Sequence, residues 1–282
     1  MNLIPRVQPS VTFGATFHGK VDRLEAEFLK MDQVECPVVH RFGPGIYIRE
    51  VRVPAGSYAI GHAQKRVHLN IFLKGRVSVV NEDGTTTELV APMTFVGQPG
   101  RKVGYVHEEM VWQNVYATDE TDIEKLEAMF LDKSDVWNSH QSSLPLLSFD
   151  ADRTDYRLVL EQFGFTEEVA RAQSENEEDQ IPFPMGSYKV AVMPSQIEGR
   201  GLFAMAGIDA GECIAPARIG GMRTPAGRFT NHSATPNARM VMRGTDIDLV
   251  ALRAIMGCRG GQLGEEITID YREALGLQIK GE

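Results

Sequence analysis

Short apolar stretches separated by glycine and proline dominate residues 46–116. The apolar segments are 47–53, 69–73 and 77–80, and the turn-forming segments are 54–56, 74–75 and 81–84. Short strands alternating with such turns are typical of antiparallel β-structure that closes as a sandwich or barrel. We therefore predict a first domain that is mainly β.

Segments whose apolar residues are spaced as in a helix lie on both sides of this β-region. The apolar positions before it are Val21, Leu24, Phe28 and Met31, and those after it are Ile123, Leu126, Met129 and Phe130. Recurrence at three and four residues predicts one buried face on each helix. Asp122 stands where it can cap the second helix.

The pattern changes beyond residue 133. A polar stretch at 138–143 precedes an amphipathic helix predicted over 156–163 and a second helix after Thr166, and an acidic run at 175–179 leads to two prolines. Strands are then predicted over 188–192 and 247–255. We expect a β-domain with flanking helices over 1–145, a helical and acidic linker over 146–185, and a compact β-rich domain over 186–282.

Composition argues against nucleic-acid binding, a disulfide or zinc framework, and a membrane partner. Among 282 residues the formal net charge is −9 and no basic run is interleaved with aromatics, so we expect no nucleic-acid partner. Three scattered cysteines give neither a disulfide framework nor a zinc motif. Without a signal-like N-terminus or a long apolar run, we expect a soluble cytoplasmic protein with no membrane partner.

The string Gly199-Arg200-Gly201-Leu202-Phe203-Ala204 can be interpreted in two ways. As G-x-G-x-x-A after a strand it could open a dinucleotide-binding helix. Gly207, Gly211 and Pro216 interrupt any helix there, and no acidic residue lies near position 224. We therefore predict that no helix follows this string.

Two further segments stand near the C-terminus. Arg228-Phe229-Thr230-Asn231-His232-Ser233-Ala234-Thr235-Pro236-Asn237 is followed by Gly264-Glu265-Glu266-Ile267-Thr268-Ile269-Asp270-Tyr271. Together with the glycine string, they resemble the ordered signatures of SET-domain protein lysine methyltransferases. The resemblance covers residues 199–271 and implies a C-terminal β-rich SET domain.

The resemblance also implies roles for individual residues. Gly199, Arg200, Gly201, Asn231 and His232 would contact S-adenosylmethionine, and Tyr271 would place its hydroxyl at the reacting amine. The implied reaction is methyl transfer to a lysine of a protein substrate. Such an in-line displacement depends on holding donor and acceptor together, so it requires neither a metal nor a covalent nucleophile.

Some parts of that family's pattern are missing from this sequence. No second tyrosine corresponds to the family's Y-x-G segment between Phe203 and Asp270, and no cysteine-rich lid follows Tyr271. Another subunit, the first domain or residues 156–184 would have to provide the lid. The alternative function is a structural or assembly protein that uses both folds for subunit contacts. Under either interpretation we expect a homo-oligomer or a larger assembly.

The rhythm of residues 54–115 resembles a cupin domain. Aligned on Gly75, Gln64 and His68 stand where that family has a histidine and a glutamate, so most of its metal ligands are absent. His62, His68 and His107 could in principle form a three-imidazole site. The other interpretation, surface or hydrogen-bonded histidines in a binding or oligomerisation module, is the one we favour, so we predict no metal.

Overall fold

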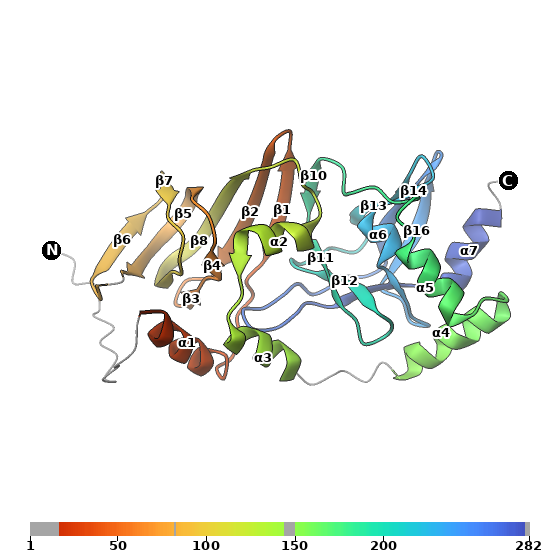
Figure 1. The fold of residues 1–282 in the computed structure, drawn as a ribbon, viewed down its shortest axis with the longest axis horizontal. Coiled ribbons are helices and arrows are strands. Elements are labelled where there is room, and N and C mark those ends of the chain that lie inside the picture. The colour runs from red at the N-terminus through yellow and green to blue at the C-terminus, as the bar shows by residue number, and fades with distance from the viewer. Residues whose placement is uncertain (1–16, 82, 144–149, 280–282) are drawn as a thin grey trace. The chain divides into compact units, whose positions relative to one another are not determined.

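The computed structural model describes residues 17–81, 83–143 and 150–279 of the chain, which is mainly β (Figure 1). The chain divides into two compact units. The first comprises residues 1–120, 125–144 and 259–262, and the second comprises 121–124, 145–258 and 263–282.

Antiparallel strands make up most of the first unit. Its strands are β1 (Val38–Gly43), β2 (Ile46–Val53), β3 (Tyr58–Ile60), β4 (Ala63–Gln64), β5 (His68–Val80), β6 (Thr86–Val90), β7 (Met93–Gly97), β8 (Val103–Ala117) and β9 (Leu131–Asp132). Its helices are α1 (Phe17–Phe28) and α3 (Asp135–Ser143), and α2 (Ile123–Phe130) begins at the boundary between the units. The predicted flanking helices are confirmed, and Asp122 caps α2 by accepting from the backbone N–H of Glu124 at 3.0 Å.

The main sheet of this unit is built around two long strands. Within the unit the strand order is β1-β2-β8-β5-β6, with β3 paired to β8 and β7 paired to β5. The first half of β5 pairs with β7 and its second half with β6. In β8, the start of the strand pairs with β3 and its later part with β2. The two long strands therefore bend, and each carries two sets of neighbours.

The predicted turn at residues 74–75 is wrong, because Lys74 and Gly75 lie inside β5. The register against β8 shifts between Phe72 and Val77, so the segment is a bulge that bends the strand. Gly75 has φ +100°, and a Cβ there would lie 2.5 Å from the carbonyl oxygen of Glu109. A glycine is therefore required by both the backbone conformation and the close approach of β8.

The expected closed barrel does not form among the strands that the structure describes. No pairing joins β1 to β6 within the unit, and β4 pairs only with β9 in a separate small sheet. The bulges in β5 fold the sheet over its own core, so apolar burial does not need ring closure. The result is a bent antiparallel sheet.

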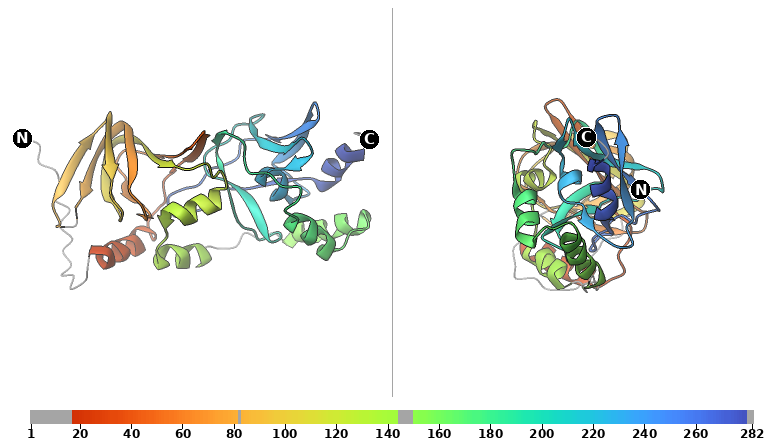
Figure 2. Two further views of the ribbon diagram at one scale, coloured as in Figure 1. Left: turned by 45° about the horizontal axis from the view of Figure 1, so that its top comes forward. Right: turned by 90° about the vertical axis from the view of Figure 1, so that its right-hand side faces the viewer.

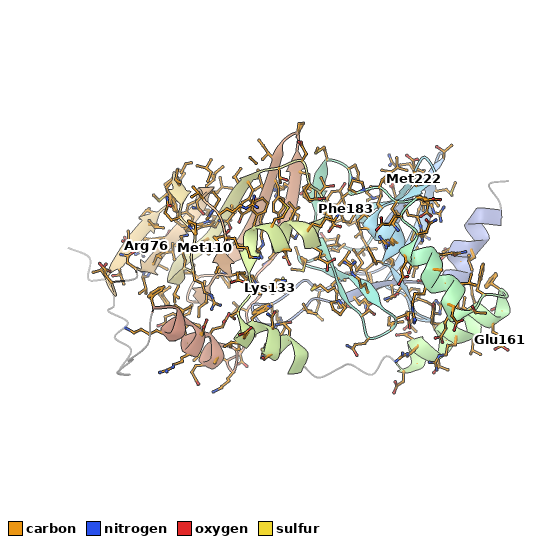
Figure 3. All side chains as sticks on the ribbon, viewed as in Figure 1. Arg76, Met110, Lys133, Glu161, Phe183 and Met222 are labelled. Atoms are coloured by element: carbon orange, nitrogen blue, oxygen red, sulfur yellow. The ribbon has the colours of Figure 1, made fainter. Side chains whose placement is uncertain are left out.

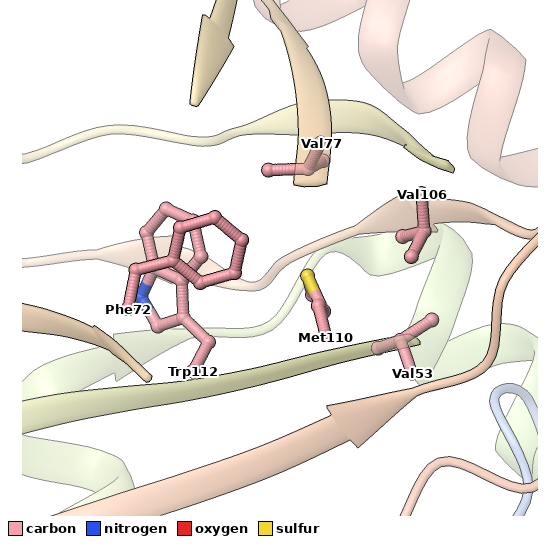
Figure 4. Packing of buried hydrophobic residues seen from close by; sticks show 6 residues of the cluster. All are labelled: Val53, Phe72, Val77, Val106, Met110 and Trp112. Carbon is pink, nitrogen blue, oxygen red and sulfur yellow. The ribbon is translucent and has the colours of Figure 1, made fainter. Parts of the chain in front are cut away.

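A cluster of apolar side chains fills the bend of this sheet (Figure 4). Its buried members are Val53, Phe72, Val77, Val106, Met110 and Trp112. Phe72 is fully buried and its ring centroid lies 5.2 Å from that of Trp112. Burying such side chains stabilises the fold by about 1.5 to 3 kcal/mol each.

Two sheets and several helices form the second unit. The strands are β10 (Gly186–Tyr188), β11 (Val190–Pro194), β12 (Arg200–Ala204), β13 (Cys213–Ile219), β14 (Met222–Arg223), β15 (Asn231–His232), β16 (Ala238–Arg243), β17 (Asp246–Ala251) and β18 (Glu266–Ile269). The helices are α4 (Asp150–Gln162), α5 (Glu167–Glu175), α6 (Pro225–Arg228) and α7 (Tyr271–Ile279). One sheet has the order β11-β12-β18-β15 and the other β14-β13-β17-β16.

The helices expected in the linker belong to this second unit. Helices α4 and α5 lie side by side in both sets of views (Figures 1 and 2), and α4 contacts β15. Thr166 caps α5 by accepting from the backbone N–H of Val169 at 3.3 Å. The acidic run that follows is attached to β14 by an ion pair, because Asp179 lies 2.8 Å from Arg223.

In residues 17–81, 83–143 and 150–279, no helix has the length and apolar character needed to cross a membrane.

Candidate functional site

Strand β18 brings the three sequence motifs together. It pairs antiparallel with β12, where Leu202 lies opposite Ile267, and parallel with β15, where Asn231 lies opposite Thr268. The glycine string is the strand β12 and no helix follows it directly, which confirms that it does not open a dinucleotide-binding unit. Residues distant in sequence thus meet around one central strand.

The Asn231 side chain links these strands. Its amide nitrogen donates to Glu266 Oε1 at 2.8 Å and to the carbonyl oxygens of Glu198 and Arg200, each at 3.1 Å. An amide has two N–H donors, so its donor capacity is fully used within the protein. Asn231 therefore holds β15 against the turn that leads into β12.

Glu266 is the buried carboxyl at the centre of this arrangement. It is 8% exposed, and Ser195 Oγ donates to its two oxygens at 2.8 and 3.0 Å. Burial raises the pKa of Glu266, although the bonds from Asn231 and Ser195 act in the opposite direction. A Cβ on Gly201 would lie 2.2 Å from Glu266 Oε1. The second glycine of the string therefore leaves room for this carboxyl.

Asn237 attaches the turn after β15 to the same strand. Its amide nitrogen donates to the carbonyl oxygen of Glu266 at 2.8 Å, and its Oδ1 accepts from the backbone N–H of Thr268 at 2.9 Å. The turn after β15 is therefore fixed beside the C-terminal strand β18.

His232 is held between a carboxylate and the backbone. Its ring is fully buried, Nε2 lies 2.8 Å from Asp155 Oδ2, and Nδ1 accepts from the backbone N–H of Tyr271 at 3.1 Å. Because Nδ1 is an acceptor, the proton of the neutral ring resides on Nε2 and points at Asp155. Both ring nitrogens are therefore engaged.

Asp155 lies on α4, three residues after Asp152. Arg272 donates to its two oxygens at 2.8 and 3.0 Å, in a bidentate pair. The hydrogen bonds from Arg272 and His232 hold the pKa of Asp155 well below its usual range. Asp152 lies on the same face of the helix and accepts from Ser233 Oγ at 2.6 Å. Helix α4 thus fixes two consecutive residues of the β15 segment.

Tyr271 begins α7 beside this network. Its hydroxyl donates to the carbonyl oxygen of Thr230 at 3.1 Å. The Tyr156 ring from α4 stands edge-on to it, with 6.1 Å between ring centroids. Burial raises the pKa of Tyr271 well above its ordinary value, so the hydroxyl keeps its proton at neutral pH.

The remaining predicted site residues lie at the start of β12. Gly199 has φ +50° and accepts from the backbone N–H of Ser195 at 3.0 Å in the turn between β11 and β12. The guanidinium carbon of Arg200 lies 4.5 Å from the centre of the Phe229 ring, and that of Arg228 lies 4.7 Å from it. Arg200 also forms an ion pair with Glu124. Two cations therefore flank one aromatic ring near Asn231.

The side chains predicted to contact S-adenosylmethionine are already engaged within the protein, whereas part of the β15 backbone is not. The amide donors of Asn231 and both nitrogens of His232 already have partners. Strand β15 is the last strand of its sheet in the described chain, so one side of its backbone has no neighbouring strand. Such an edge offers N–H and C=O groups to a ligand.

Sequence reasoning missed Asp155, and it assigned no role to Glu266. The helix was predicted only over 156–163, whereas α4 begins at Asp150, so Asp152 and Asp155 were not recognised as sharing a face with Tyr156. Their partners lie more than 70 positions away in the chain. Glu266 resembled a solvated residue in sequence, yet it is buried.

The three histidines considered as possible metal ligands, His62, His68 and His107, are not gathered into one site. The His62 ring contacts Trp137, with centroids 4.9 Å apart, and the His68 ring contacts Tyr116 at 5.6 Å. His107 Nε2 lies 2.7 Å from the hydroxyl of Ser78. Within the described ranges, no group of three or more His, Cys, Asp or Glu residues is placed to hold a metal ion.

Comparison with known proteins returns structural neighbours only. No family model matches the chain, and no curated protein matches it. A cupin domain from Bordetella pertussis Tohama I is 15% identical, covers 31% of this chain and 98% of its own, and has a TM-score of 0.26. A cupin-2 domain protein from Shewanella frigidimarina NCIMB 400 is 15% identical, with 36% and 99% covered and a TM-score of 0.25.

Ectoine synthase from P. lautus is a further neighbour, 14% identical over 37% of this chain and 85% of its own, with a TM-score of 0.27. These similarities cover about a third of the chain and carry no argument about what it does. The chain is mainly β, and its structural neighbours include cupin-domain proteins.

Proposed function

We propose that the second unit binds S-adenosylmethionine and catalyses methyl transfer to a lysine side chain of a protein. The observation that carries this proposal is the meeting of the three SET-like segments around β18, with the Tyr271 hydroxyl 3.1 Å from the carbonyl oxygen of Thr230. Thr230 immediately precedes β15, so the Tyr271 hydroxyl is fixed next to that strand. A fixed hydroxyl suits a reaction that depends on positioning.

When bound, S-adenosylmethionine would supply the methyl group on its sulfonium. The chain's own residues provide the geometry: Glu266 and Asn231 fix β15 from one side, and Asp155 fixes the His232 ring from the other. Because His232 Nδ1 accepts from the backbone of Tyr271, the start of α7 is fixed relative to β15. The protonated Tyr271 hydroxyl is then oriented by Thr230.

Helix α4 offers a replacement for the missing second tyrosine of the family pattern. Tyr156 is 7% exposed and stands edge-on to Tyr271. Two aromatic rings at this angle can form one wall of a narrow site for an aliphatic chain. We therefore assign to α4 part of the substrate-recognising role that the sequence left open.

A catalytically inactive assembly protein is the second candidate. It is favoured by the internal hydrogen bonds of Asn231, His232 and Tyr271, which together stabilise the fold without any ligand. Light scattering that reveals a large homo-oligomer, together with a Tyr271→Phe variant indistinguishable from the parent, would support this candidate.

The deciding experiment is transfer of labelled methyl from S-adenosylmethionine into a cell lysate by the full chain. Tyr271→Phe should lower the labelling by about 100-fold, a typical effect of losing one oriented donor at a reacting centre. The matched control is Tyr188→Phe, which also removes a hydroxyl bonded to a carbonyl oxygen, that of Pro184 at 2.9 Å. Calorimetry that detects no cofactor binding at millimolar concentration would refute the proposal.

A further inference from the structure

A row of polar side chains crosses the bent sheet of the first unit. The strand registers place His40 opposite Arg49, Arg49 opposite Asn114, and Asn114 opposite Asn70. Residues paired directly across strands point to the same face, with Cβ atoms about 5 Å apart. The row therefore runs over four neighbouring strands, β1, β2, β8 and β5.

Aromatic and apolar rows lie on both sides of it. One neighbouring row contains Tyr47 opposite Tyr116, and the other contains Val51 opposite Trp112. Tyr116 also lines an open pocket of about 470 Å³, whose other walls are mainly apolar. The polar row thus lies in apolar surroundings, and the pocket reaches the neighbouring Tyr116 but is not lined by any member of the row.

At one end of the row the amide oxygen of Asn70 is satisfied internally, whereas its buried amide nitrogen has no hydrogen-bond partner in the described chain. Asn70 Oδ1 accepts from Trp112 Nε1 at 2.9 Å and from Asn114 Nδ2 at 2.8 Å. The Trp112 contact fixes the orientation of the Asn70 amide, because an indole N–H can only donate. The Asn70 amide nitrogen then faces the ring of His68, whose pKa it helps to raise against the larger effect of burial.

The other end of the row has donors without acceptors. The Nε of Arg49 is buried and has no hydrogen-bond partner in the described chain, and the charge of Arg49 helps Lys133 to lower the pKa of the Glu127 carboxyl. The adjacent carboxylate of Glu50 points to the opposite face, where Arg41 and Arg52 contact it. An unpaired guanidinium in a largely buried position is costly unless an anion accompanies it.

His40 provides a second donor directly opposite Arg49. It is fully buried, its Nδ1 lies 2.8 Å from the Tyr47 hydroxyl, and its Nε2 has no partner. Burial raises the pKa of Tyr47 far above its ordinary value, so that hydroxyl stays protonated and donates to Nδ1. The ring is neutral, since burial lowers the pKa of His40 to about 4, and its proton is therefore on Nε2.

His62 and two charged residues complete the surroundings. The Nδ1 of His62 is buried without a partner, and burial together with Arg49 lowers its pKa to about 3. Glu127, on α2, pairs at 2.7 Å with Lys133, which is labelled in Figure 3. Arg49, Lys133 and Glu127 together carry a net charge of one positive (2 − 1 = 1), and Arg101, which also acts on His62, is paired with Asp22 and Glu25. That balance matches a monoanion.

We infer that the His40 and Arg49 end of this row binds a small monocarboxylate, with its oxygens accepting from Arg49 and from His40 Nε2. An arginine fork fits a carboxylate in a planar, two-point contact. A metal cation does not suit the place, because the guanidinium would repel it and no group of three possible ligands is gathered in the described parts of the chain. The neighbouring tyrosines pack against the body of the ligand.

The experiment is calorimetric titration of the full chain with sodium acetate and sodium benzoate, using sodium chloride at equal ionic strength as the reference. Arg49→Gln should weaken carboxylate binding by about 10- to 100-fold, the effect of losing a charged hydrogen-bonding group. Arg52→Gln is the matched control, because Arg52 lies on the same strand but contacts Glu50 on the opposite face. It should bind as the parent does.

Stability without ligand gives an independent result. Arg49→Gln removes an unpaired buried cation, so its melting temperature in chloride should equal or exceed that of the parent. If Arg49→Gln fails to fold, Arg49→Lys keeps the charge but loses the fork, and it should still bind more weakly than the parent. The inference is overturned by parent protein that binds neither carboxylate beyond the chloride reference, by Arg49 variants that bind unchanged, or by phosphate dianion binding more tightly than the monoanions.

Discussion

Two carboxyls of the second unit, the partly exposed Asp155 and the buried Glu266, have pKa shifts in opposite directions. Asp155 is kept ionised by Arg272 and His232, whereas burial favours the protonated form of Glu266. Both residues hold the β15 segment, Asp155 through His232 and Glu266 through Asn231. The pH dependence of stability should therefore have contributions of opposite sign from the same site.

Asp155→Asn should lower the free energy of unfolding at neutral pH by about 1 to 3 kcal/mol, because the bonds from Arg272 and His232 lose their charged acceptor. The pKa of Asp155 is lowered in the folded state, so its stabilisation is present above the ordinary aspartate pKa of about 3.9 and is lost as the pH falls. Urea unfolding of parent and variant at several pH values measures this difference.

The difference between the two proteins should shrink steadily as the pH falls below about 3.9. Glu161→Gln, on the exposed side of the same helix (Figure 3), is the control and should change stability little at any pH. A difference between parent and Asp155→Asn that persists unchanged into acid would contradict the role given to the ionised carboxylate.

At the scale of elements, the pairing of β12 with β18 depends on Gly201, because a side chain there would collide with Glu266. Phe203 lies opposite Glu266, and the Glu266 carboxyl occupies the space where Gly201 would carry a Cβ. The string that resembles a phosphate-binding loop in sequence is therefore a strand whose second glycine accommodates a buried carboxyl. Its first glycine, Gly199, serves the turn before the strand.

Gly201→Ala should destabilise the second unit by about 1 to 3 kcal/mol, because the new methyl group overlaps Glu266 Oε1. Gly207→Ala is the comparison, since nothing lies within 4 Å of a Cβ at that position. Chemical denaturation of both variants gives the two values. Equal stability of Gly201→Ala and Gly207→Ala would show that Glu266 can move aside.

Local signals in the sequence predicted several elements. Helical spacing predicted α1, α2 and α4, and Asp122 acts as the predicted cap of α2. The turn predicted at Lys74-Gly75 was wrong, because glycine marks both turns and bulges, and only the neighbouring β8 distinguishes the two. The motif order predicted which segments carry the candidate site. The partners of His232 and Asn231 could not be predicted, since they depend on long-range packing.

At the scale of the whole molecule, each unit has its own buried core. Phe72 is fully buried in the first unit, and Leu249 is fully buried in β17 of the second. Residues 259–262 belong to the first unit although the second unit precedes and follows them in sequence, which the predicted boundaries at 145 and 186 did not include. The expected oligomer, lysine-bearing protein partner and cytoplasmic location stay predictions.

Phe72→Ala should destabilise the first unit by about 3 to 5 kcal/mol through the cavity it leaves, and Leu249→Ala should destabilise the second by about 2 to 5 kcal/mol. Hydrogen exchange followed by mass spectrometry can assign each effect. Faster exchange should be confined to β5 and β8 in the first variant and to β16 and β17 in the second. Faster exchange in all four strands of either variant would mean that the units unfold together.

The position of β18 between β12 and β15 also determines when the second unit can fold. Leu202 of β12 and Asn231 of β15 can pair with β18 only after Ile267 and Thr268 have been synthesised. During synthesis the edges of β12 and β15 therefore stay unpaired until nearly the whole unit has been translated. A ribosome that pauses before codon 266 would leave two incomplete strand edges available to the wrong neighbours, so the rate of translation there bears on the yield of folded protein.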